Sequence, residues 1–249
     1  MRALEFTKRN VKEILRDPLS WVFMIFLPGL LFVVLEIMVD AIGADMSYTP
    51  QFEVKRLTVS MIIFAFSFIT IFTGNTLAKD REDRFLMRLK AAPMRPFDFV
   101  FGYTVAVLPF AALQEIVVGL TGLCFGLEVS GSLLIMMAAM LPVSLIFIGF
   151  GVLFGSLISS KGVGGIASII PTAASLTGGM FFPLETMEGG FKNMCDALPF
   201  ANAIGIGGAL IGGDASGVTA SAVIGIGYVA AIYILAVAIF SIKLRGDSI

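Results

Sequence analysis

The sequence predicts an all-α integral membrane protein with six transmembrane helices. Of its 249 residues, 57% are hydrophobic and only 14% are charged, and the mean hydropathy is +0.96. Soluble domains carry roughly 25% charged residues. Apolar runs of about 20 residues recur along the chain, and each can cross a hydrocarbon core about 30 Å thick. A transmembrane barrel would show alternating segments of about ten residues instead, and the sequence contains none.

Six apolar segments are the expected spans. The first carries Pro28 and Gly29 near its middle, where a kink is expected because proline removes a backbone donor. The third begins at Asp98, a residue type that often caps helix N-termini. The expected spans are residues 19–39, 57–78, 98–125, 132–158, 163–182 and 216–242.

Residues 1–17 predict a helix that lies on the membrane surface ahead of the first span. Its apolar stripe consists of Leu4, Val11, Ile14 and Leu15, with Thr7 in register. Another face carries basic residues at intervals of four, namely Lys8, Lys12 and Arg16. This pattern is typical of an interfacial helix that faces anionic head groups. A helix that is merely solvated is the alternative.

The longest charged segment of the chain is residues 79–97, between the second and third spans. It carries six basic and three acidic side chains. Apolar residues recur at helical spacing between residues 85 and 89, so one face of a short helix can be buried while the charged face stays in water. Pro93 and Pro96 end this helix. A rigid charged helix between two spans can transmit force from a partner protein, so we expect this segment to be the functional centre.

The distribution of Lys and Arg predicts the orientation of the chain. With the N-terminus in the cytoplasm, 14 of the basic residues fall on the inner side and three on the outer side. The outer three are Lys55, Arg56 and Lys192. We therefore expect both termini to be cytoplasmic in a multi-pass protein of the cell membrane.

Residues 183–214 contain too many glycines and prolines for one span, and we expect short re-entrant helices at the outer surface. Cys124 and Cys195 both fall on the outer side, where a disulfide between them is one alternative and two free thiols the other. Gly151 and Gly155 form a close-packing pattern in the fourth span. Packing within one bundle is favoured over packing between subunits.

Two features of the spans are candidates for a substrate path. Glu115 lies within the third span, where an acid is costly and points to a function by default. It can bind a cationic substrate or a proton, or it can be a satisfied structural group. The phenylalanines of the second span can line a path for an apolar substrate or simply face lipid. The full set of candidate path residues is Phe64, Phe68, Thr70, Asn75, Glu115, Thr172 and Ser175.

Several chemistries are excluded by residue types that the chain lacks. With no histidine, neither His-ligated metals nor His general bases are available, and two cysteines cannot form a Cys-rich metal site. No phosphate-binding loop of the Gly-x4-Gly-Lys-Ser/Thr type occurs, since Ser160-Lys161-Gly162 lacks its first glycine and its spacing. The chain is therefore not expected to be an enzyme, and any ATP that powers it must be hydrolysed by another chain.

The order of several motifs resembles the membrane subunit of the ABC type-2 exporters, which include daunorubicin-resistance, nodulation-factor and O-antigen permeases. The resemblance covers essentially the whole chain. Its entry is the motif LRDPLSWVFMIFLPGLL (15–31), where a surface helix meets a proline-broken span. Its cytoplasmic loop is KDREDRFLMRLKAAPMRPFDFVFGY (79–103). The segments GVLFGSLISS (151–160) and 178–204 resemble the end of span four and the outer re-entrant segment.

The resemblance implies a partner-driven transporter. Residues 1–17 would be a connecting helix and about 81–90 a coupling helix that contacts two copies of a separate ATPase subunit, which would bind ATP and Mg. The coupling residues would be Arg81, Glu82, Arg84, Arg88 and Lys90. A second permease chain, expected to be identical, would pair with this one, with spans one, two and five near the pathway; no nucleic acid is expected. A proton- or ion-coupled secondary carrier that uses Glu115 is the alternative, and an intramembrane enzyme is a third reading that lacks a catalytic set.

Overall fold

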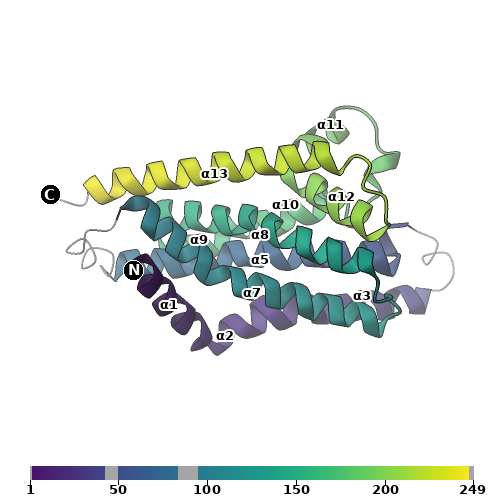
Figure 1. Ribbon diagram of the computed structural model, residues 1–249, viewed down its shortest axis with the longest axis horizontal. Coiled ribbons are helices and arrows are strands. Elements are labelled where there is room, and N and C mark those ends of the chain that lie inside the picture. Colours follow the sequence, from purple (N-terminus) through teal and green to yellow (C-terminus); the bar gives the residue numbers. More distant parts are fainter. Residues whose placement is uncertain (1, 43–49, 84–94, 247–249) are drawn as a thin grey trace.

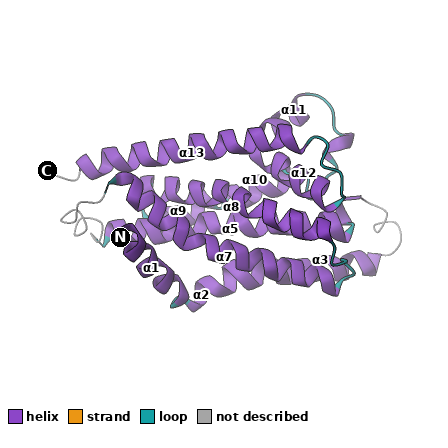
Figure 2. Ribbon diagram, viewed as in Figure 1, coloured by secondary structure: helices purple, strands orange, loops and turns teal. Residues whose placement is uncertain are grey.

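The computed structural model describes residues 2–42, 50–83 and 95–246, and the regular elements of these ranges are all helical (Figures 1 and 2). In chain order they are α1 (Arg2–Leu15), α2 (Pro18–Trp21), the π-helix η1 (Val22–Phe26), α3 (Leu27–Ile42), the 3-10 turn η2 (Pro50–Phe52), α5 (Val54–Glu82), α7 (Pro96–Cys124), α8 (Gly131–Leu157), α9 (Ser160–Ala167), α10 (Ile169–Thr177), the 3-10 turn η3 (Leu184–Thr186), α11 (Gly190–Ala197), α12 (Pro199–Ile211) and α13 (Val218–Gly246).

The long helices run side by side and make an elongated bundle (Figure 1). Within the described ranges five helical stretches are long and apolar enough to cross a membrane, and a sixth is added if α11 and α12, bent by 75°, are taken together. The five are Met24–Ile42, Val54–Glu82, Pro96–Cys124, Gly131–Leu157 and Val218–Ile242. The protein is thus a multi-span helical membrane protein. Both chain termini lie at one end of the bundle, called here the termini end, and α11 and α12 lie at the opposite end.

Helix α5 is the most enclosed span. In its most apolar stretch 78% of the residues are buried, against 17% in α13. It packs against α7, α8, α9 and α12. The approach of α5 to α8 is so close that a Cβ added at Gly155 would lie 2.6 Å from the carbonyl oxygen of Gly74. The small residues of α8 therefore serve packing within the chain, the favoured one of the two alternatives.

The first span contains a π-helical turn directly before the proline that is expected to kink it. Pro28 has no N–H, so the carbonyl of Met24, four residues earlier, loses its α-helical donor. The turn at Val22–Phe26 widens the helix here, and Leu27 donates its N–H to Val22. The side-chain amide of Gln114 in α7 donates to the carbonyls of both Met24 and Ala65, the latter at 3.1 Å. One glutamine thereby joins the first, second and third spans.

Two of the differences from the expected span boundaries have a clear local cause. The helix of span three begins at Pro96, and Asp98 is its third residue rather than its cap; its carboxylate accepts the N–H of Arg95 at 2.8 Å. Proline suits the first position because its fixed φ is helical and its missing N–H is not needed there. The segment expected as span five is divided at Ser168 into α9 and α10. Pro171 explains the break, since it cannot donate to Ala167, the last residue of α9.

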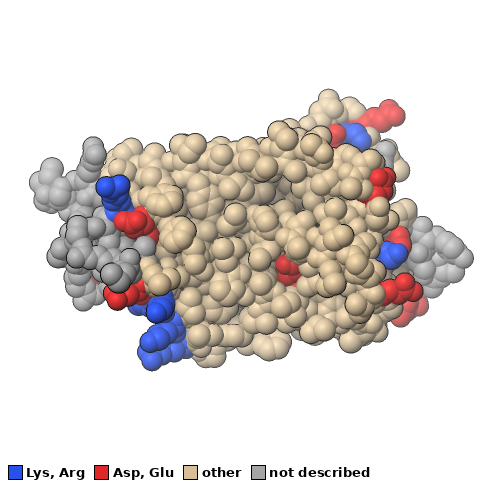
Figure 3. Space-filling view, viewed as in Figure 1, with Lys and Arg blue, Asp and Glu red and all other residues tan. Residues whose placement is uncertain are grey.

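The charged residues gather at the two ends of the bundle, and the band between them is largely apolar (Figure 3). Large hydrophobic side chains are exposed along this band, for example Phe26, Leu30 and Ile226. An exposed apolar belt bounded by charged ends is what a helical bundle presents to a bilayer.

Candidate functional site

The site lies at the termini end, where α1 packs across the end of α5 and the beginning of α7. Helix α1 has two apolar faces rather than one. Phe6 and Ile14 are buried against the bundle together with Thr7 and Asn10, whereas Leu4 and Leu15 are more than half exposed. The apolar stripe expected from the sequence thus divides, with Thr7 and Ile14 facing protein and Leu4 and Leu15 facing outward.

Apolar contacts fix α1 on α7 at a glycine. The ring of Phe6 packs edge-on against Phe99 and Tyr103, with centroids 5.6 and 5.1 Å apart. Gly102 makes room for this ring, because a Cβ at that position would overlap the Phe6 side chain. The helix can therefore approach α7 only where α7 has no side chain.

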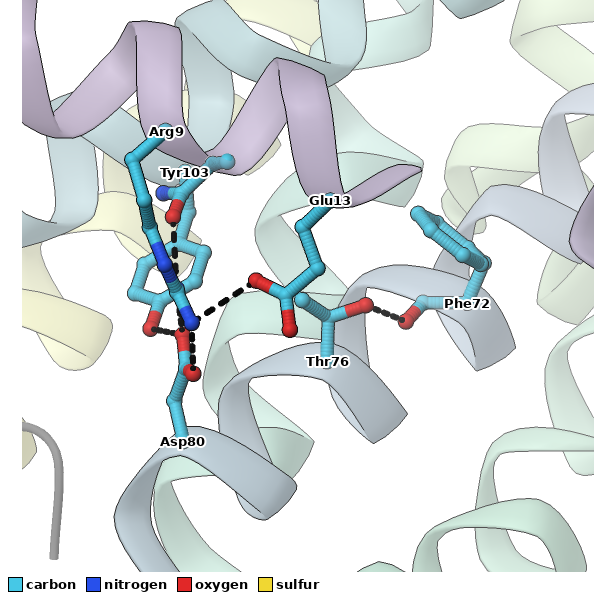
Figure 4. Close-up of polar contacts among 7 residues, drawn as sticks. Arg9, Glu13, Phe72, Thr76, Asp80 and Tyr103 are labelled. Atoms are coloured by element: carbon cyan, nitrogen blue, oxygen red, sulfur yellow. Dashed lines mark hydrogen bonds and ion pairs between the residues drawn. The ribbon is translucent and has the colours of Figure 1, made fainter. Parts of the chain in front are cut away.

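A buried polar network ties α1 to both α5 and α7 (Figure 4). The guanidinium of Arg9 donates to both carboxylate oxygens of Asp80, at 2.5 and 2.7 Å, across 71 residues of sequence. The hydroxyl of Tyr103 donates to the same carboxylate at 2.6 Å. Asp80 is only 3% exposed. Bidentate pairing of this kind is strong and directional, so it fixes the position of α1 relative to α5.

Glu13 completes the network on α1. It forms an ion pair with Arg9 at 2.8 Å, one helical turn away. Partial burial raises the pKa of Glu13 above its usual value, and the charge of Asp80 adds to this effect. Burial alone would lower the pKa of Arg9, but the hydrogen bond and charge of Asp80 outweigh it and raise that pKa. Arg9 is therefore a fixed positive charge shared by two carboxylates.

The next two residues of α5 contact two further helices. Arg81 donates to the carbonyl of Ile158 at 2.7 Å and to that of Ser156, at the C-terminal end of α8. Glu82 accepts the backbone N–H of Ser160, the first residue of α9, at 2.8 Å, and also the Ser160 hydroxyl. A cation at a helix C-terminus and an anion at a helix N-terminus both complement the helix dipole.

Three consecutive residues therefore connect the end of α5 to four helices. We call Asp80, Arg81 and Glu82 the α5 hub. Asp80 holds α1 and α7, Arg81 holds α8, and Glu82 holds α9. A displacement of the end of α5 is thereby passed to the surface helix and to the ends of three others. Arg84, Arg88 and Lys90, also expected as coupling residues, lie outside the described residues.

The candidate path residues are distributed over several faces. Phe64, Phe68 and Asn75 lie on the partly exposed face of α5, where the two rings pack edge-on at 5.1 Å. Thr70 lies on the opposite face, and its hydroxyl donates to the backbone carbonyl of Phe147 in α8 at 2.9 Å. Thr172 and Ser175, the α10 residues, are bonded to backbone carbonyls of their own helix. None of the seven lines the cavity that Lys55 and Lys192 border or the hollow beside Lys8 and Lys12 of α1.

Glu115 lies on α7 next to Gln114 and is 3% exposed. One of its carboxylate oxygens is buried and has no hydrogen-bond partner among the described residues. An unpaired buried carboxyl group is costly in an apolar bundle. The sequence allows two interpretations of Glu115, a functional acid and a satisfied structural group. The described residues contain no partner for this oxygen, as the second interpretation would require.

The two thiols are both free, with Cys124 exposed and Cys195 buried. Of the two alternatives that the sequence allows, a disulfide between these cysteines or two free thiols, the structure has the free thiols.

The sequence did not indicate the parts of the site that depend on distant contacts. For Asp80 the sequence contains one signal, since it follows the apolar pair Leu77 and Ala78 at a spacing that places it on the buried face of α5. For Arg9 and Tyr103 no local pattern indicates their partner. Gln114 donates to the Met24 carbonyl, which has no helical donor because Pro28 lacks an N–H. This contact can be seen only once the first and third spans are packed together.

Comparison with known protein families identifies the family to which this chain belongs. The profile of the ABC-2 type transporter family matches residues 3–206, most of the chain. The chain belongs to the ABC-2 type transporter family. The match begins in α1, includes the α5 hub and ends within α12.

Two curated relatives of this ABC-2 protein are similar over part of its length. The probable multidrug ABC transporter permease YbhR of Escherichia coli K12 is 28% identical over 153 residues. YbhR of Escherichia coli O157:H7 gives the same identity over the same length. The aligned part covers 59% of this chain and 41% of each relative, so this chain matches less than half of the length of those permeases.

Proposed function

We propose that this ABC-2 protein is the permease subunit of an ATP-driven exporter in the cell membrane. It moves a hydrophobic or amphipathic substrate, drug-like or lipid-linked, out of the cytoplasm. Two separate ATPase subunits bind ATP and Mg, and a second, identical permease chain completes the translocation unit. The name of the relatives, multidrug permeases, supports a drug-like substrate.

The α5 hub is the observation that carries this proposal. Segment 84–94, which contains three of the five expected coupling residues (Arg84, Arg88 and Lys90), begins one residue after the hub, which contains the other two. A force applied to that segment by an ATPase reaches Asp80, Arg81 and Glu82 first, and from them α1, α7, α8 and α9. Rigid-body transmission requires contacts of this directional, multidentate kind.

The proposed topology has six spans with both termini in the cytoplasm. Helices α9 and α10 together form span five, broken at Ser168, while α11 and α12 form the re-entrant outer segment. The partly exposed face of α5, with Phe64, Phe68 and Asn75, then faces the second permease chain and the pathway. The bend of 75° between α11 and α12 supports a segment that enters and leaves on the same side.

The first test is recovery of the tagged protein from native membranes in mild detergent, with mass spectrometry of what co-purifies. The proposal expects a stoichiometric ATPase that carries a phosphate-binding loop. Recovery of this chain alone, in several mild detergents at native expression, would contradict it. That outcome would favour a proton- or ion-coupled secondary carrier, for which the unpaired carboxyl group of Glu115 is the supporting observation.

The second test exchanges the charges of the hub. In the variant R81E/E82R each helix end faces a charge of the wrong sign, so we expect permease-stimulated ATP hydrolysis by the complex in nanodiscs to fall by roughly tenfold or more. The matched control is E5K/K8E, which exchanges two exposed charges outside the hub and the coupling segment and should leave the activity within about twofold. Full activity in R81E/E82R, with the ATPase still bound, would show that the hub does not transmit the signal.

A further inference from the structure

A cavity of about 510 Å³ opens at the end of the bundle opposite the termini. It lies between the beginning of α5, the loop after α10, helices α11 and α12 and the first turns of α13. Its volume falls within the range of about 300–1,000 Å³ that ligand sites occupy. We call this cavity the outer cavity; two of the helices around it, α11 and α12, lie at the end of the bundle opposite α1 (Figure 1).

The basic residues of the outer side converge on this cavity. Lys55, Arg56 and Lys192, the only Lys and Arg residues that the sequence places there, all line it. They come from α5 and α11, which are remote in the sequence. In the proposed topology nearly all Lys and Arg residues lie on the cytoplasmic side, and the three that lie on the outer side all border this cavity.

Two of the three basic side chains, Lys55 and Lys192, are not paired with the acids of the cavity. Glu53 and Asp196 also line it, yet in the described residues neither lysine has a carboxylate within the 4 Å of an ion pair. The ammonium groups of these two lysines are therefore open to an anionic ligand. The apolar wall of the cavity, to which Leu184, Ile204 and Ile211 contribute, lies beside these charges.

We propose that the outer cavity binds the phosphate head group of a phospholipid. The ammonium groups of Lys55 and Lys192 hold the phosphate oxygens by charge-assisted hydrogen bonds, with Arg56 adding its charge. The apolar wall accommodates the first carbons of the acyl chains. The inference uses the orientation proposed above to assign these basic residues to the outer side and the lipid to the outer leaflet.

Lipid binding to the purified chain in detergent tests this proposal without any ATPase. The probe is dioctanoyl phosphatidylglycerol, titrated and read out by native mass spectrometry. We expect saturable binding that K55Q/K192Q weakens by about tenfold or more, since two charge-assisted contacts are removed. The arginine variant K55R/K192R should retain binding within about threefold, because it keeps both charges. The control K79Q/K161Q removes two exposed lysines at the termini end, outside the basic face of α1, and should bind as the native chain does.

Three results would overturn the proposal. The first is native-like affinity in K55Q/K192Q. The second is equal binding of dioctanoylglycerol, which has no phosphate. The third is equal binding of inorganic phosphate alone, which would make the outer cavity a site for a free anion. Size-exclusion profiles establish that the variants are folded. Because no ATPase is present, failure here leaves the proposed exporter function untouched, and loss of the ATPase partner leaves this site untouched.

Discussion

At the scale of single residues, adjacent polar side chains of α7 have opposite roles. Gln114 fills two backbone acceptors, and one of them, the Met24 carbonyl, has lost its helical donor to Pro28. Glu115, the next residue, leaves a buried oxygen without a partner among the described residues. The side-chain oxygen of Gln114 is likewise buried without a partner among the described residues, but its amide nitrogen joins three spans. Glu115 makes no such compensating contact in the described part of the chain, so its buried oxygen costs folding free energy.

This contrast predicts opposite effects of the same substitution. Gln114→Leu should lower the free energy of unfolding in detergent by roughly 1–3 kcal/mol, because a buried carbonyl loses its donor. Glu115→Leu should leave the stability unchanged or raise it, because an unpaired polar group is replaced by an apolar one. Thermal unfolding of the two variants beside the native chain provides the measurement. A loss of stability in Glu115→Leu as large as that in Gln114→Leu would mean that Glu115 has a structural partner.

At the scale of elements, α1 is held to the bundle by one apolar and one polar contact. The Phe6 ring occupies the space left by Gly102, and Arg9 pairs with Asp80 one helical turn further on. Its other apolar face, with Leu4 and Leu15, remains exposed beside the membrane band. The helix is therefore fixed to the α5 hub on one side and presents exposed apolar side chains on the other.

A substitution at Gly102 should release this helix. In Gly102→Val the new side chain overlaps the Phe6 ring, and overpacking of this kind costs roughly 1–3 kcal/mol. We expect faster proteolysis within α1 and a lower unfolding temperature. The control is Gly225→Val in α13, where no atom lies within 4 Å of the added Cβ, and there the change should stay within about 0.5 kcal/mol. Equal protease resistance of α1 in both variants would show that Phe6 does not determine its docking.

The elements also show where sequence reasoning succeeds and where it fails. The helical membrane class and the family follow from local signals, namely apolar length and the order of short motifs. The break at Ser168 also has a local signal, Pro171, but apolar length alone predicts one unbroken span there. The α5 hub carried no such signal, because Arg9, Asp80 and Tyr103 meet only when three helices pack. Pairing between distant polar residues is a property of packing and not of periodicity.

At the scale of the whole molecule, the charge distribution connects the two functional ends. The termini end carries the α5 hub and both chain ends, and the opposite end carries the outer cavity (Figures 1 and 3). The proposed functions of the two ends require opposite sides of the membrane, since an ATPase acts in the cytoplasm and the lipid site is assigned to the outer leaflet. The orientation of the chain is thus the assumption that both proposals share.

Side-specific labelling in intact cells tests that orientation directly. In a background in which Cys124 and Cys195 are replaced by serine, single cysteines are introduced as Glu188→Cys at the opposite end and Lys161→Cys at the termini end, both at exposed positions. A membrane-impermeant maleimide should label the first variant in intact cells and the second only after permeabilisation, because the excess of Lys and Arg retains the termini end in the cytoplasm. The reverse pattern would place the outer cavity in the cytoplasm and would remove the hub from reach of an ATPase. Export driven through α5 and a lipid site in the outer leaflet would then both be untenable.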